Sequence, residues 1–178
     1  TGYVNLLDNA TQDEVLRQTK AILGNKPYIA GAFVSDRQGD PFHLQKYIDR
    51  MDAIQSHGGT PIIFQSFGLT KGPGNDIITR YQQLSRACDQ FLGFELTQDL
   101  APFGAIYDLE TFEELMRIPN CLGLKHSSFH RQPEWDRLIR RQVVRPDFVL
   151  YTGNDFAIDM VMYGSDYLLG LSTFAPDL

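Results

Sequence analysis

Lys125 is the residue of this sequence whose position most clearly suggests chemistry. It ends the apolar run Cys121-Leu122-Gly123-Leu124 and is followed by His126, Ser127 and Ser128. A lysine at the carboxyl end of a buried strand loses water, so its pKa falls and its neutral amine becomes a nucleophile. Two interpretations are open: Lys125 forms a Schiff base with a carbonyl compound, or its stem is buried while its amine extends into solvent.

Composition limits the classes of partner. The 178 residues, 43% of them hydrophobic, are enough to bury one sizeable core, and we expect a single domain over residues 1–178. The net charge of -6 and the pI near 5.1 argue against binding to nucleic acid or to an anionic membrane.

The cysteines and the hydropathy of the chain bear on its compartment. Cys88 and Cys121 lie in apolar patterns without CxxC or metal-ligand spacing, which predicts buried, reduced thiols. No signal peptide is recognisable, and no apolar run approaches the ~18 residues of a membrane span. We therefore expect a cytoplasmic protein with no membrane partner.

The elements that must position Lys125 alternate regularly along the chain. Six units, each a helix followed by a strand, are predicted, and the strands are apolar throughout rather than alternating. Such strands need cover on both faces, which indicates a parallel sheet wrapped by helices. The first helix is expected to be capped by Thr11 with Glu14 as its capping-box partner. The six predicted strands are 27–34, 60–65, 91–96, 121–128, 147–151 and 166–172.

A parallel α/β chain forms either a doubly wound sheet or a (β/α)₈ TIM barrel. The doubly wound fold predicts a phosphate-binding GxGxxG or GxxxxGK[ST] loop, and neither is present. A barrel places polar residues at the carboxyl ends of its strands, where its active site lies. The strand ends here carry such residues, among them Gln65-Ser66, Glu95, Lys125-His126-Ser127 and Thr152-Gly153-Asn154-Asp155. The pattern favours the barrel.

Three stretches resemble the dihydrodipicolinate synthase and N-acetylneuraminate lyase superfamily, which are class I Schiff-base aldolases. Residues 28–32, Tyr-Ile-Ala-Gly-Ala, resemble the family's third strand, and residues 122–128 resemble the sixth-strand motif whose lysine forms the imine. Residues 150–155 and 164–172 resemble the seventh and eighth strands. The resemblance implies that this chain covers the barrel from the end of strand two to strand eight, with Thr1-Gly2 as the remnant of a carboxylate-binding T-T-G-E turn.

The chain departs from the family pattern near the lysine. The family places a tyrosine near the end of strand five as a proton relay, and alignment by strand length puts Glu95 there, with a shift of one or two residues open. Ser66-Phe67 replaces the paired tyrosines expected after strand four. Glu95 is then either a general acid or base, if the apolar barrel raises its pKa, or a carboxylate ion-paired with Lys125 or an arginine.

The resemblance implies a lyase, aldolase or hydro-lyase acting on a 2-keto acid of the pyruvate type. Lys125 and Glu95 are the expected catalytic residues, and substrate binding is expected from Thr1, Gly2, Ser127, Gly153 and Ser172. No cofactor is expected, because the protonated imine is itself the electron sink, and the chain is expected to form a homo-oligomer, a dimer or tetramer. Two alternatives remain open: a non-catalytic member that binds a keto acid or sugar acid, and a metal-dependent barrel enzyme using Glu95, His126 and Asp155.

Overall fold

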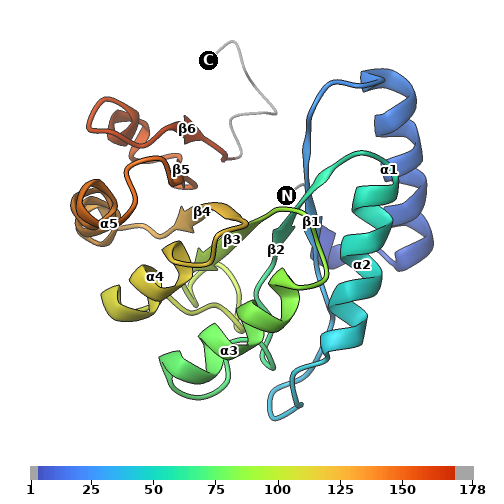
Figure 1. Cartoon of the computed structure of the whole chain (residues 1–178), viewed down its shortest axis with the longest axis horizontal. Coiled ribbons are helices and arrows are strands. Elements are labelled where there is room, and N and C mark those ends of the chain that lie inside the picture. Colours follow the sequence, from blue (N-terminus) through green and yellow to red (C-terminus); the bar gives the residue numbers. More distant parts are fainter. Residues whose placement is uncertain (1–3, 171–178) are drawn as a thin grey trace.

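The structure is a computed structural model and describes residues 4–170. Helices and strands alternate through this part of the chain (Figure 1). A short 3₁₀ helix, η1 (Val4–Leu6), precedes the first unit, and a second, η2 (Ile158–Val161), follows β5. The helices are α1 (Asn9–Leu23), α2 (Leu44–Ser56), α3 (Gly74–Ser85), α4 (Leu109–Met116) and α5 (Arg131–Val144). The strands are β1 (Ile29–Ala32), β2 (Thr60–Ile63), β3 (Phe91–Leu96), β4 (Cys121–Ser127), β5 (Val149–Thr152) and β6 (Tyr167–Leu168).

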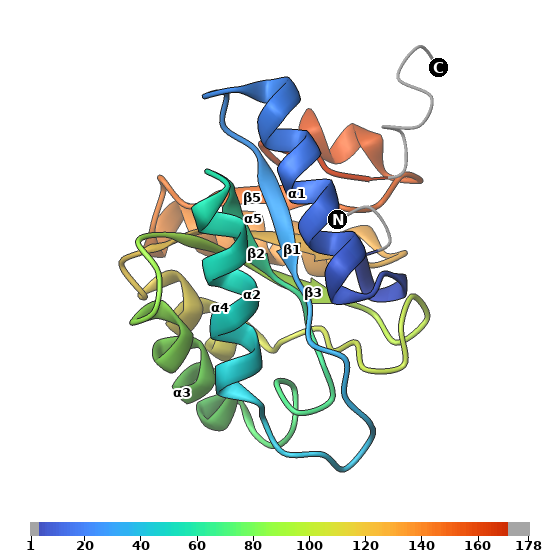
Figure 2. The ribbon, with the colours of Figure 1, turned by 90° about the vertical axis from the view of Figure 1, so that its right-hand side faces the viewer.

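The strands form one six-stranded sheet in the order β1-β2-β3-β4-β5-β6, and every neighbouring pair is parallel. The sheet curls, and the helices follow its outer side in an arc (Figures 1 and 2). The described residues thus form part of a (β/α)₈ barrel, as the sequence predicts. Because all strands run the same way, their carboxyl ends meet at one rim.

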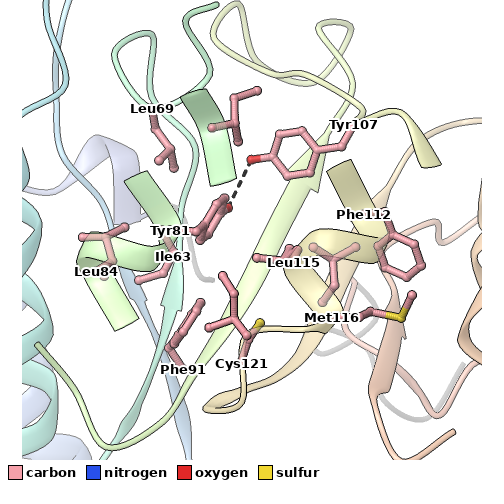
Figure 3. Close-up of a cluster of buried hydrophobic side chains, with 14 of the residues drawn as sticks. Ile63, Leu69, Tyr81, Leu84, Phe91, Tyr107, Phe112, Leu115, Met116 and Cys121 are labelled. Carbon is pink, nitrogen blue, oxygen red and sulfur yellow. Dashed lines mark hydrogen bonds between the residues drawn. The ribbon is translucent and has the colours of Figure 1, made fainter. Parts of the chain in front are cut away.

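Two hydrophobic clusters lie on the two faces of this sheet. The larger, outer cluster fills the space between strands and helices (Figure 3). Within it, Tyr81 of α3 and Tyr107 of the β3–α4 loop share a hydrogen bond of 3.1 Å between their hydroxyls. The smaller, inner cluster faces the barrel axis and consists of Val4, Phe33, Ile62, Phe64, Leu92, Phe94 and Leu96. Each strand end can therefore present side chains to two different environments.

Three local predictions are wrong. Helix α1 begins two residues before Thr11: the N-cap is Asp8, whose Oδ1 accepts the backbone N–H of Thr11 at 2.8 Å, while Glu14 binds Arg17. The helix that the sequence predicts before the sixth strand is reduced to η2. Cys88 lies beyond the end of α3 and is only partly buried, whereas Cys121 is buried in β4 as predicted.

Within residues 4–170, no helix has the length and apolarity to cross a bilayer.

Candidate functional site

The last residues of β4 point alternately to the two faces of the sheet. Lys125 lies on the inner face, where its Nζ is 4.7 Å from the ring centroid of Phe94. The ring of the next residue, His126, lies on the outer face and contacts Glu95. Successive strand residues alternate in this way, so Ser127 shares the inner face with the lysine. The polar residues at the end of β4 therefore lie in two different environments.

Aromatic side chains flank Lys125 on the neighbouring strands. Phe94 of β3 and Tyr151 of β5 are its partners in the parallel register, and Phe64 meets Phe94 edge to face at 4.8 Å. Lys125 is only 6% exposed. This burial lowers the pKa of the Lys125 amine from 10.5 to about 8, against an opposing effect from the charge of Asp155. The inner face therefore raises the fraction of the amine that is neutral and nucleophilic, compared with a solvent-exposed lysine.

Two predicted substrate-binding residues lie beside the lysine. Ser127 is 3% exposed, two residues further along β4. Gly153 follows β5, and its N–H donates to the carbonyl oxygen of His126 at 2.7 Å. A Cβ on Gly153 would lie 2.8 Å from Cε of Lys125 and would collide with Oγ of Ser127. Glycine is thus required for the β5 strand end to approach β4 so closely.

Glu95 does not lie beside Lys125, so the predicted proton shuttle at this residue lacks the geometry that it needs. Its carboxylate is fully buried on the outer face and binds Arg137 of α5, with Nη2 at 2.9 Å and Nε in a second contact. It also accepts Nδ1 of His126 at 2.7 Å and the backbone N–H of Tyr107 at 2.9 Å. The structure therefore supports the other interpretation of Glu95, an ion pair with an arginine.

Glu95 is held in its charged form. Burial alone would raise the pKa of its carboxyl, but the charge of Arg137 and the hydrogen bond from His126 outweigh burial and leave that pKa below its ordinary value. His126 extends the network, since its Nε2 lies 3.0 Å from Oγ of Ser128, which also bonds the backbone of His130. This outer network fixes the end of β4 and the loop after it.

The other predicted substrate-binding residues, Thr1, Gly2 and Ser172, lie outside the described residues. Arg131, the first residue of α5, forms an exposed ion pair with Asp159. Among residues 4–170, no group of three or more His, Cys, Asp or Glu side chains is arranged to hold a metal ion.

Comparisons with solved structures place this fold among known proteins. A dihydrodipicolinate synthase from Bacteroides thetaiotaomicron has a TM-score of 0.81 at 14% identity, over 97% of this chain and 55% of that one. A prophage protein of the dihydrodipicolinic acid synthase family from E. coli K12, in complex with pyruvate, also scores 0.81, at 15% identity over 98% and 57%. The fold is that of the dihydrodipicolinate synthases.

The N-acetylneuraminate lyase from Mycoplasma synoviae shares this synthase-type fold, with a TM-score of 0.71 at 17% identity over 95% of this chain and 53% of that one. The resemblance inferred from the sequence is thus confirmed for the fold. This chain spans 53–57% of the length of the solved structures that it matches. No protein-family model and no curated protein matches its sequence.

The parallel register shows which residue of β3 lies beside Lys125. The sequence resemblance takes β3 as the family's fifth strand, and the residue of β3 in register with Lys125 is Phe94, not Glu95. An aromatic ring is therefore present next to the lysine, but without the hydroxyl. The sequence signal for this placement was strand alternation: Phe94 and Lys125 both lie two residues before the end of their strand.

Proposed function

We propose that this chain carries the Schiff-base site of a lyase, an aldolase or hydro-lyase, that acts on a 2-keto acid of the pyruvate type. The observation that supports it is the placement of Lys125: it is buried on the inner face at the carboxyl rim of the sheet, and the pKa of its amine is about 8. Two of the solved structures with this fold were determined with pyruvate. This likeness in fold supports the choice of substrate class.

The proposed reaction begins with attack of the neutral Nζ of Lys125 on the ketone carbon. The carbinolamine hydroxyl then takes up a proton from solvent and leaves as water, which carries the ketone oxygen, and an iminium remains. At pH 7 about a tenth of an amine with a pKa of 8 is unprotonated, against roughly one in three thousand for an ordinary lysine. The iminium withdraws electrons from the adjacent carbon, so a C–C or C–O bond can be formed or broken there without a cofactor.

Ser127 and Gly153 are proposed to border the bound keto acid, because Gly153 lies against the side chains of both Lys125 and Ser127. Thr1, Gly2 and Ser172 stay in the proposed carboxylate-binding set on the strength of the sequence resemblance alone. A homo-oligomer remains the expectation from that resemblance, and a cytoplasmic location remains the expectation from the sequence.

A second candidate function is binding of a keto acid or sugar acid without turnover. The observation that favours it is Phe94, which leaves the neighbour of Lys125 on β3 without a hydroxyl for proton transfer. Imine formation by Lys125 does not need a hydroxyl at position 94, so the lyase remains the preferred proposal.

Borohydride trapping tests the proposal. The protein is incubated with pyruvate and with larger 2-keto acids, reduced with borohydride, and analysed by peptide mass spectrometry. We expect a reduced adduct on Lys125, none in Lys125→Ala, and an unchanged yield in Lys46→Ala, which removes an exposed lysine of α2. The absence of an adduct with every keto acid, across a pH series spanning the pKa of about 8, would overturn the proposal.

A further inference from the structure

The strand end after β5 carries a carboxylate, Asp155, two residues after the glycine that packs against Lys125. Gly153 packs against the side chains of Lys125 and Ser127, as described above. The turn that follows is fixed by its own hydrogen bonds: the N–H of Phe156 donates to Oδ1 of Asn154 at 3.0 Å. Asp155 therefore leaves this turn from a defined position at the carboxyl rim, two residues after the glycine that touches the lysine.

A second glycine makes room for the Asp155 side chain. A Cβ on Gly170, just beyond β6, would lie 2.7 Å from Cγ and 2.8 Å from Oδ2 of Asp155. The carboxylate thus lies against the backbone at the end of the next strand, where only glycine fits. The charge of Asp155 also acts on Lys125, raising the pKa of the amine against the effect of burial. The first observation places the carboxylate at the rim, against the end of β6, and the second shows that its charge acts on the amine of Lys125.

Proton transfer at the imine needs an acid–base group, and the other nearby groups are unsuited to it. Glu95 and His126 are bonded to each other on the outer face. Phe94 has no exchangeable proton. Burial raises the pKa of the Tyr151 hydroxyl, so this phenol stays protonated at neutral pH; it can relay a proton but is not the base that removes one from carbon. Asp155 is the remaining nearby carboxylate on the side of Lys125 in the part of the chain that the structure describes.

We propose that Asp155 is the general base of this site and takes the proton from the carbon next to the imine. The C–H electron pair forms the C=C bond of an enamine, the C=N electrons move onto Nζ of Lys125, and the proton goes to the Asp155 carboxylate. The protonated Asp155 then returns the proton in the reverse step, so no co-reactant is consumed. This inference rests on the proposed Schiff-base function and assigns its proton transfer to a residue other than a tyrosine.

Exchange of the pyruvate methyl protons in D₂O, followed by NMR, isolates this step from imine formation. We expect the wild-type protein to exchange these protons, and Asp155→Asn to lose at least about a hundredfold in exchange rate while still giving the borohydride adduct on Lys125. Asp155→Glu is expected to recover part of the rate. Asp147→Asn, which changes an exposed carboxylate before β5, is the matched control and should exchange at the wild-type rate.

Each other outcome overturns the inference in a recognisable way. Unchanged exchange in Asp155→Asn would show that another group moves the proton. Parallel loss of adduct and exchange would show that Asp155 supports imine formation or folding rather than the C–H step. If the wild-type protein gives no adduct, the proposed function fails first, and this inference fails with it.

Discussion

At the carboxyl end of β4, the outer face of the sheet stabilises the charged form of a buried side chain, whereas the inner face destabilises it. On the outer face, Glu95 receives donors from Arg137, His126 and the backbone, and its pKa shifts toward the charged form. On the inner face, Lys125 lies between aromatic side chains, and its pKa shifts toward the neutral form. β4 thus lies between two different sites. On one face a buried ion pair with additional hydrogen-bond donors stabilises the fold, and on the other a largely buried amine is suited to reaction.

Arg137→Ala removes the cation of the outer-face ion pair and should cause the largest decrease in stability. It leaves Glu95 buried without its cation, so we expect the free energy of unfolding to fall by about 3–5 kcal/mol, measured by urea denaturation. The double variant Glu95→Leu/Arg137→Met removes both charges and should recover most of the loss. A decrease below about 1 kcal/mol for Arg137→Ala would contradict a strongly coupled pair.

The pH dependence of stability in Lys125→Met tests whether the inner face lowers the pKa of the lysine. In the unfolded chain the lysine has a pKa of 10.5 and in the folded chain about 8, so between these pH values the unfolded state holds more protons. Wild-type stability should therefore rise with pH across this window, on the order of 3 kcal/mol in total, and the penalty is full below pH 8. Lys125→Met should remove the rise, and exposed Lys46→Met should keep it. A pH-independent difference between wild type and Lys125→Met would contradict the lowered pKa.

Phe94→Tyr adds a phenol where the inner face has only a ring. The ring centroid of Phe94 lies 4.7 Å from Nζ of Lys125, so the new hydroxyl enters the surroundings of the imine, where it can relay a proton to and from the base without being the base itself. We expect exchange of the pyruvate methyl protons to become about 10-fold to 100-fold faster, a gain at or below the lower end of general acid–base catalysis. Phe64→Tyr, one strand further from the lysine, is the matched control. Equal rates in the two variants would show that proximity to Lys125 does not matter.

The sequence predicts the fold well because its signals are repetitive. Six apolar strands separated by helical periods define the parallel sheet, and the position of Lys125 at the end of the 121–128 strand is set by the same pattern. The predicted strand 166–172 is longer than β6, which covers Tyr167–Leu168, and residues 171 and 172 lie outside the described part. Short elements such as η2 escape prediction because tertiary contacts, not periodicity, decide between a 3₁₀ turn and a helix.

The site is harder to predict, because it depends on which face each residue occupies. Glu95 and Phe94 are neighbours in sequence, and a shift of one residue moves the side chain to the other face of the sheet. The partner that explains Glu95 is Arg137, which is 42 residues away and carries no local sequence signal. Asp155 was considered only as a metal ligand, since the roles of Gly153 and Gly170 are visible only once three strand ends are brought together.

Asp159→Asn provides the weakest test and completes the comparison. Asp159 binds Arg131 through two contacts of 2.9 and 3.2 Å, a geometry like that of Glu95 with Arg137, but the two side chains are 43% and 55% exposed. Water already solvates both charges, so their separation costs little and salt screens their attraction. We expect the urea midpoint to fall only slightly in Asp159→Asn, and the difference from wild type to vanish at high salt. The effect of Arg137→Ala should persist at high salt, because its ion pair is shielded from solvent. Equal salt sensitivity of the two variants would show that burial does not distinguish the two pairs.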